Sequence, residues 1–401
     1  MKKVLFVAII ATLIAVGCEK TEIINPNLGT EILFSPELGK LTKAEGEIDA
    51  TLKAQGFKVS AINAYEDLYT TAVEFNTVYR EMDNLQFVYN NGWALQNGQS
   101  YFWPGTGKDL VFLAVSSKTG TVEIPEIVQN GFGITGTPET DSEDNNTGAY
   151  TGITVNNFTI PDFIVTPPSY VKVAGENSNV GDQTGADDDL MVAKVVIQNQ
   201  DDDQGVVKGQ VKLDFSHTLS KVQFVFTTNT TDTYPVTVNK VEIKDVINKA
   251  TLGVGVSFAN ESRTSTNTYD WSPSDNDEDD DYLAQKDDDN HNYVDFVIDY
   301  NLSLVTNQEL PYATWLVIPQ SLEDKMVSIT YTIADNNNTD ANGIAATSQF
   351  TSVFPLYTTN LTTWSINQYV RYKINLSPNL ITFNPVVTED WSTNTDVAHN
   401  N

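Results

Sequence analysis

The chain has 401 residues, 53 of them acidic and 23 basic, and a formal net charge of −30 at pH 7. This balance excludes nucleic acid as a partner, because no basic face is available to neutralise phosphates, and it excludes a polybasic attachment to anionic membranes. Hydrophobic residues make up 40% of the chain, which is enough to bury a core, and the length predicts two domains.

Residues 1–18 have the pattern of an export signal. Lys2 and Lys3 precede an apolar run over residues 4–16, which is too short to cross a bilayer as a stable helix. Small residues then lead to Cys18, the only cysteine of the chain, in an arrangement that resembles a bacterial lipobox. We therefore expect a signal peptide over residues 1–17, lipid on Cys18 and a polar tether over residues 18–28. The alternative is an ordinary signal peptide with an incidental cysteine.

The N-terminal half is assigned to residues 29–203. Abundant Thr, Asn, Val and Tyr favour strands over helices throughout. Residues 38–56 are rich in Lys and Glu without a strong period, which predicts an exposed segment. A turn is expected at residues 90–92, where Asn-Asn-Gly follows an apolar run. Strands are predicted around residues 32–34, 57–64, 85–89, 110–115, 157–160 and 190–196.

The acidic stretch 201–205 marks the expected domain boundary, and residues 204–401 form the C-terminal half. Here apolar and polar residues alternate: Val211, Leu213 and Phe215 share one face of a strand, and Lys212 and Asp214 share the other. One buried and one wet face in each strand predicts an all-β sandwich. The same alternation recurs at residues 222–226, 252–258, 327–333 and 370–376.

Catalytic equipment is not recognisable in the sequence. Histidine occurs only as His217, His291 and His399, and no Gly-x-Ser-x-Gly turn is present to carry a nucleophile. His217 directly follows a predicted strand and is interpreted as a satisfied turn histidine. Cys and His clusters that would hold zinc are absent. We expect no enzyme activity and no cofactor.

Calcium is the one metal that the sequence raises. Asp275, Asp277 and Asp279 begin like an EF-hand loop, but Asp280 replaces the glycine at position 6 and Lys286 replaces the glutamate at position 12. A solvated acidic loop is the favoured interpretation. A weak calcium site of another kind is the alternative, because clustered carboxylates repel one another unless a cation lies between them.

The aromatic residues allow a second function. Stacking on sugar rings would make the chain a cell-surface glycan-binding lipoprotein of a nutrient-uptake system, and an exposed coplanar row of rings would favour that function. Most of these aromatics lie in apolar strands, so core packing is the preferred interpretation. They are Trp93, Tyr101, Trp103, Trp315, Trp364 and Trp391.

Five motifs occur in a characteristic order. They are Gly92-Trp93 with Tyr101-Phe102-Trp103-Pro104 and Leu110-Val111-Phe112-Leu113-Ala114, then Asp189-Leu190-Met191-Val192-Ala193, VKLDFSHTLSKV at residues 211–222, Leu316-Val317-Ile318-Pro319-Gln320, and the stretch from Ile381 to Trp391. In this order, behind a lipobox, they resemble the Bacteroidales-type fimbrillins, especially the Mfa-like branch.

The resemblance implies two transthyretin-like β-sandwich domains in tandem after a lipoprotein signal peptide. It also implies a surface-exposed lipoprotein of the cell outer membrane, held there by lipid on Cys18, and a structural subunit or accessory or tip adhesin of a fimbria. The implied partners are other fimbrial subunits, through proteolysis-triggered donor-strand exchange, and a host protein or glycan ligand.

The resemblance further implies a processing site and a leaving strand. A trypsin-like protease would cut between Lys43 and Ala44, and the strand at Ile32, Leu33 and Phe34 would depart. A strand from a neighbouring subunit would then fill the vacated groove. The first arginine of the chain is Arg80, whereas family processing often follows arginine. An uncleaved anchor or accessory subunit, or a tip subunit, therefore stays open.

Overall fold

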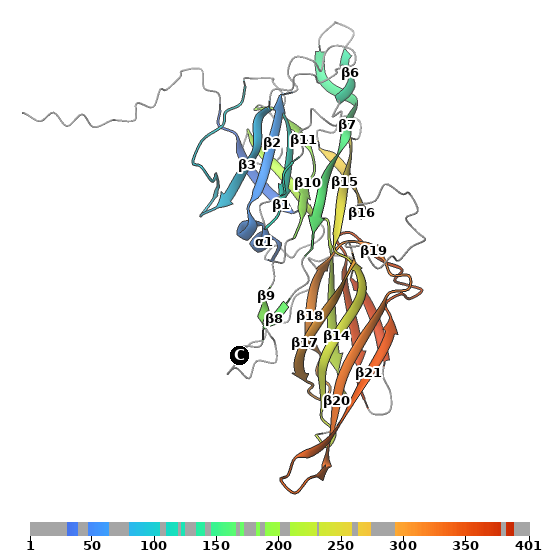
Figure 1. Cartoon of the computed structure of the whole chain (residues 1–401). Coiled ribbons are helices and arrows are strands. Elements are labelled where there is room, and N and C mark those ends of the chain that lie inside the picture. Colours follow the sequence, from blue (N-terminus) through green and yellow to red (C-terminus); the bar gives the residue numbers. More distant parts are fainter. Residues whose placement is uncertain are drawn as a thin grey trace, which may run out of the picture.

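The computed structural model describes residues 30–38, 47–63, 80–104, 110–118, 122–124, 134–140, 146–165, 169–171, 182–184, 189–200, 209–230, 232–258, 264–273, 293–377 and 382–388. Within them the fold is all-β, as predicted, and α1 (Glu47–Gln55) is the single helix. No helix of these residues is long and apolar enough to cross a membrane. Figure 1 shows an elongated molecule with one layered group of strands above another.

The largest sheet lies in the upper part of the molecule. Its strands run in the order β1-β12-β10-β5-β2-β3-β4, and β11 also pairs with β5. Their bounds are β1 (Leu33–Leu38), β2 (Phe57–Asn63), β3 (Arg80–Tyr89), β4 (Trp93–Leu95), β5 (Leu110–Ser116), β10 (Met191–Ala193), β11 (Val196–Gln198) and β12 (Gln210–His217).

A second, four-stranded sheet completes the upper part in the order β16-β15-β7-β6. The bounds are β6 (Ile134–Thr140), β7 (Asn146–Ile164), β15 (Lys249–Phe258) and β16 (Ser265–Pro273), and a separate pair is formed by β8 (Ser169–Val171) and β9 (Asp182–Thr184).

The lower part contains two four-stranded sheets, ordered β18-β13-β23-β24 and β17-β14-β20-β21. The rings of Phe296 on β17 and Trp315 on β18 meet edge to face at 5.7 Å, so the two sheets pack across a shared core. The bounds are β13 (Ser220–Thr227), β14 (Val236–Ile247), β17 (Tyr293–Ser303), β18 (Leu310–Val317), β20 (Met326–Thr339), β21 (Ala345–Pro355), β23 (Tyr369–Asn375) and β24 (Thr382–Thr388), with a short pair β19 (Gln320–Ser321) and β22 (Thr363–Trp364).

Sheet membership crosses the residue at which the sequence places the domain boundary. β12, β15 and β16 all follow residue 204, yet β12 pairs with β1 and β10, and β15 pairs with β7. The chain therefore returns to the upper sheets after residue 204. Two separately folding domains divided there stay a prediction.

Two hydrophobic clusters form the core. The predicted alternation is confirmed in β12, where Val211, Leu213 and Phe215 are fully buried. β5 is buried along its whole length because one face, with Val111 and Leu113, joins the larger cluster, and the other, with Phe112, joins the smaller.

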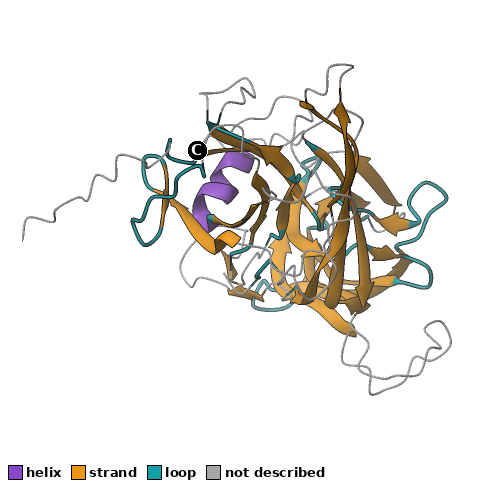
Figure 2. Cartoon of the chain, turned by 90° about the horizontal axis from the view of Figure 1, so that it is seen from above, coloured by secondary structure: helices purple, strands orange, loops and turns teal. Residues whose placement is uncertain are grey.

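The segment between β1 and β2 differs from its prediction. Residues 38–56 were expected to be exposed, but residues 47–55 form α1, and Leu52 is 2% exposed within the smaller cluster. Gln55 Nε2 also donates to Asp189 O at 3.0 Å, and the apolar residues of this short helix are too few to give a periodic signal. Figure 2 shows α1 as the lone helix beside strands.

Candidate functional site: the seat of the first strand

The backbone of β1 lies at one end of the large sheet. β1 pairs in parallel with β12, from Leu33 opposite Gln210 to Leu38 opposite Phe215. Among the described strands β12 is its only ladder partner, so β1 is an edge strand. Pro36 fits this position, because proline has no N–H to donate to a ladder and within sheets is found mainly on edge strands.

The residues just before β1 are held from another side. Ile32 N donates to Tyr101 O at 2.8 Å, and Trp103 N donates to Thr30 O at 2.9 Å. Glu31 forms an antiparallel bridge with Phe102 between these two bonds. The first described segment is thus bonded to residues 101–103 and then to β12.

Phe34 inserts between rings from three other strands. Its ring centroid lies 4.9 Å from that of Phe87, 5.7 Å from that of Phe112 and 6.2 Å from that of Phe57, and all three pairs are edge to face. Phe34 and Ile32 are each 5% exposed, whereas Leu33 between them is 47% exposed. The segment therefore points alternate side chains into the core and into solvent.

These contacts show that the large sheet curls. Four strands separate β1 from β3 in the sheet order, yet Phe34 on β1 meets Phe87 on β3. β1 therefore closes the open side of a curled sheet over the smaller cluster. We call β12, residues 101–103 and the rings of Phe57, Phe87 and Phe112 the first-strand seat.

The start of β12 is shaped to receive this segment. Gly209 has a φ of +80°, a left-handed conformation that suits glycine, and its carbonyl accepts a bond from Trp103 Nε1 at 3.1 Å. A Cβ at Gly209 would lie 3.5 Å from Thr30 Cγ2. Trp103 is 2% exposed, so this buried corner connects the start of β12 to the residues just before β1.

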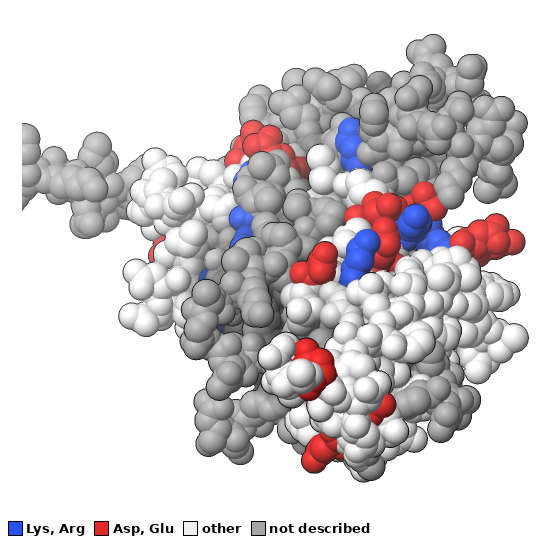
Figure 3. All heavy atoms as spheres, turned by 60° about the horizontal axis from the view of Figure 1, so that its bottom comes forward, with Lys and Arg blue, Asp and Glu red and all other residues white. Residues whose placement is uncertain are grey.

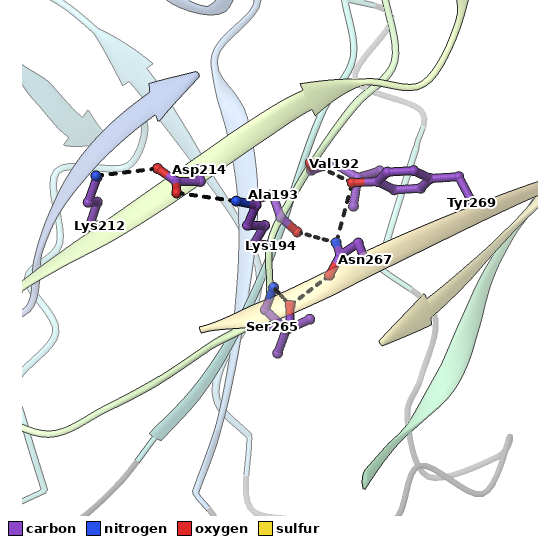
Figure 4. Close-up of polar contacts among 9 residues, drawn as sticks. Val192, Ala193, Lys194, Lys212, Asp214, Ser265, Asn267 and Tyr269 are labelled. Carbon is purple, nitrogen blue, oxygen red and sulfur yellow. Dashed lines mark hydrogen bonds and ion pairs between the residues drawn. The ribbon is translucent and has the colours of Figure 1, made fainter. Parts of the chain in front are cut away.

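Two lysine side chains form ion pairs with a carboxylate on β12, as Figure 4 shows. Asp214 on β12 lies 3.6 Å from Lys212 Nζ and 3.8 Å from Lys194 Nζ. These groups are partly exposed, so each ion pair contributes at most about 1 kcal/mol.

The neighbouring strand β10 is fastened to the second sheet in the same region. Asn267 on β16 donates to Ala193 O at 3.0 Å, and Val195 N donates to Ser265 Oγ at 2.8 Å. Tyr269 OH donates to Val192 O at 3.4 Å, and burial raises the pKa of the Tyr269 hydroxyl, with its bond to Asn267 acting in the opposite direction. These hydrogen bonds from β16 therefore join the two upper sheets next to the first-strand seat.

His217 ends β12 and makes a buried contact with a carboxylate that the sequence did not reveal. Its Nδ1 lies 2.7 Å from Asp189 Oδ2, and both side chains are 6% exposed. Sequence reasoning interpreted His217 as a satisfied turn histidine; it is the last residue of a strand and lies against the carboxylate of Asp189, 28 positions earlier. The next residue, Thr218, donates its hydroxyl to Leu190 O at 2.8 Å. Both members lie in the motifs quoted above, but only the fold brings them together.

The other predicted site residues fall outside the described part of the chain. These are Cys18, Lys43 and Ala44, together with Asp275, Asp277 and Asp279. Within the residues described, no group of three or more His, Cys, Asp or Glu side chains is placed to hold a metal ion. Only the predicted leaving strand, at Ile32, Leu33 and Phe34, is located by the structure.

The large aromatics in the described ranges serve mainly as core. Trp103, Trp315 and Trp364 are no more than 2% exposed. The exposed Tyr89 meets Trp93 edge to face, with an interplanar angle of 68°, so this pair offers no flat platform for a sugar. The preference for core packing is confirmed for these three tryptophans.

Fold and seat together define an all-β protein whose first strand completes a curled sheet. A profile described as fimbrillin-like matches residues 42–391, and the chain belongs to this fimbrillin-like family. No curated protein matches the sequence.

Several solved structures are similar to the chain. A fimbrial protein from Bacteroides vulgatus is 16% identical, with a TM-score of 0.46, over 90% of this chain and 99% of that one. The tip fimbrial protein Mfa3 from Porphyromonas gingivalis is 8% identical, with a TM-score of 0.31, over 90% and 99% of the two chains. The fimbrial anchor protein Mfa2 of the same organism is 9% identical, with a TM-score of 0.22, over 90% and 97%.

Proposed function

We propose that the chain is a structural or adhesive subunit of a cell-surface fimbria and that it acts through binding, without catalysis. Membership of the fimbrillin-like family supports this role. In the same proposal the chain is exported as a lipoprotein of the outer membrane, with lipid on Cys18, and binds other fimbrial subunits and a host protein or glycan. A free-standing glycan-binding role is the weaker candidate, because most of the described tryptophans are buried and cannot stack on a sugar.

Assembly would proceed by exchange at the first-strand seat. The observation that carries this step is the edge position of β1 combined with the burial of Ile32 and Phe34. Removing the segment would expose the surface that these side chains cover, at a cost of about 1.5–3 kcal/mol of hydrophobic stabilisation for each of them. It would also leave β12 with unpaired backbone groups, and a strand from a neighbouring subunit satisfies both needs.

The release of the segment would follow cleavage between Lys43 and Ala44. Purified full-length chain is incubated with a trypsin-like protease and run on a gel without boiling, with a Lys43→Gln variant as the matched control. We expect the wild-type chain to lose its first 43 residues and form a ladder of stable oligomers, since completed strand-exchange fibres dissociate very slowly. A trimmed chain that stays monomeric and as stable as before contradicts exchange and supports an anchor or tip role.

A further inference from the structure

The two edges of one lower sheet differ in how they are protected. This sheet ends in β17 on one side and β21 on the other. β17 carries Asp295 and Asp299 on its exposed face, and charges of this kind discourage pairing with another chain. β21, with the sequence AATSQFTSVFP, carries no charged residue and has proline only at its last position.

β21 is also long and exposed. It has 11 residues, most of them exposed, including Phe350 at 43% and Val353 at 55%. Among the described strands its only ladder partner is β20. A long uncharged edge with exposed apolar side chains is a template for strand addition.

The surroundings of β21 are uncharged as well. Residues 341–370 contain no Asp, Glu, Lys or Arg, in a chain whose net charge is −30. Figure 3, which brings the lower end of the molecule forward, shows a broad uncharged area there with only scattered acidic groups. Two copies of so acidic a protein repel each other least where they meet through such an area.

We propose that β21 pairs antiparallel with β21 of a second copy of this chain, related by a two-fold axis at Phe350. This residue is the midpoint of Ala345–Pro355, so the whole strand pairs with itself. The register sets Phe350 opposite Phe350, Ala346 opposite Phe354, Ser348 opposite Ser352, Gln349 opposite Thr351 and Thr347 opposite Val353.

This register matches the side chains on both faces. Phe350 and Phe354 face the core side of the sheet, because they pair across β20 with the buried residues Tyr331 and Val327. On that face the two Phe350 rings lie opposite each other, and Ser348 lies opposite Ser352. On the other face Gln349 meets Thr351, and no like charges are opposed. The second copy is the occupant that this self-complementary, neutral strand fits best.

The contact is distinct from the first-strand seat. β21 lies in the lower part of the molecule, whereas β1 and β12 lie in the upper part. The pairing would join subunits side by side and needs no cleavage. A single strand pair buries little area and is weak, so association is expected at a concentration on the order of 100 μM in solution.

A matched pair of substitutions tests the edge. Val353→Lys on β21 and Val297→Lys on β17 add the same charge to the two edges of one sheet, where these valines are 55% and 38% exposed. Full-length chains are compared by sedimentation over a range of concentrations. We expect Val353→Lys to weaken self-association at least tenfold and Val297→Lys to leave it unchanged. A wild-type chain that stays monomeric throughout overturns the proposal, as does an equal effect of the two substitutions.

Cysteine cross-linking tests the register. In a full-length Cys18→Ser background, which removes the chain's own thiol, Phe350→Cys is expected to give a disulfide-linked dimer on mild oxidation. Chains that carry only Thr347→Cys or only Val353→Cys should give no disulfide-linked dimer. A mixture of the two variants should give one, because the register places residue 347 of one copy opposite residue 353 of the other, within reach of a disulfide. Val297→Cys is the control on the other edge. Cross-linking at position 297 as readily as at 350 overturns the proposal.

Discussion

The two ends of this molecule carry edge strands of opposite character. β1 and the residue before it, at the edge of the large sheet, bury Phe34 and Ile32 to 5% exposure, whereas β21 in the lower sheet leaves Phe350 43% exposed and Val353 55% exposed. Both strands have one ladder partner among the residues described. The difference teaches that an edge position alone does not define a site: the side chains decide whether a strand completes a core or offers a surface.

The comparison separates two kinds of assembly. A strand that supplies core side chains is replaced only by another strand that supplies them, so the exchange proposed at β1 would be selective and slow. A strand that offers only backbone groups and a neutral face accepts a partner without losing one of its own. We therefore expect mutations at β1 to act first on folding and mutations at β21 to act first on association.

The largest effect is expected from truncating the ring that β1 inserts. Phe34→Ala removes a buried ring with three edge-to-face partners and should lower the free energy of unfolding by about 3–5 kcal/mol. Leu33→Ala is the matched control one residue away, at 47% exposure, and should cost less than about 1 kcal/mol. Chemical denaturation of the full chain measures both. Equal losses would mean that β1 is not seated as described.

The buried contact between Asp189 and His217 at the end of β12 should follow closely. Asp189→Ala removes the carboxylate 2.7 Å from His217 Nδ1 and takes this partner away from a buried ring nitrogen, which costs about 3 kcal/mol. A double-mutant cycle with His217→Gln, followed by denaturation, isolates the coupling between the two side chains. A coupling energy near zero would contradict a direct interaction.

The next largest loss of stability is expected at Gly56, directly before β2. Gly56, with a φ of +73°, precedes Phe57, and a Cβ there would lie 2.3 Å from the backbone oxygen of Phe87. Gly56→Ala should therefore cost about 2–4 kcal/mol from backbone strain and forced movement of β3. Gly92→Ala is the control, because nothing lies within 4 Å of its added Cβ, and it should change stability by less than about 0.5 kcal/mol. Thermal unfolding of both variants checks the difference.

Periodicity predicted the strands well where each has one wet and one buried face. The alternation of Val211, Leu213 and Phe215 identified β12, and Asn90-Asn91-Gly92 identified a tight turn, where Asn91 has a φ of +55°. These signals are local, because the face that a residue occupies follows from its place in the strand.

The long-range features were not predictable in the same way. Nothing near Phe34 indicates that its ring will meet Phe87, because that contact depends on how far the whole sheet curls. The pairing of Asp189 with His217 also depends on strand register across the fold. The resemblance predicted a leaving strand at residues 32–34, and the structure shows a ladder from Leu33 to Leu38; its departure stays a prediction.

The smallest loss of stability is expected from the same change, phenylalanine to alanine, on β21. Phe350 stacks on Tyr331 with ring centroids 5.5 Å apart, but 43% of the residue is exposed, so Phe350→Ala removes an aromatic pair and only part of a buried ring. We expect a loss of about 1–1.5 kcal/mol in the free energy of unfolding, several times less than for Phe34→Ala. The same variant should weaken self-association, which Phe34→Ala should affect only by unfolding the chain. Denaturation at low concentration measures stability apart from association, and a loss as large as that of Phe34→Ala would mean that β21 belongs to the core and is not a free edge.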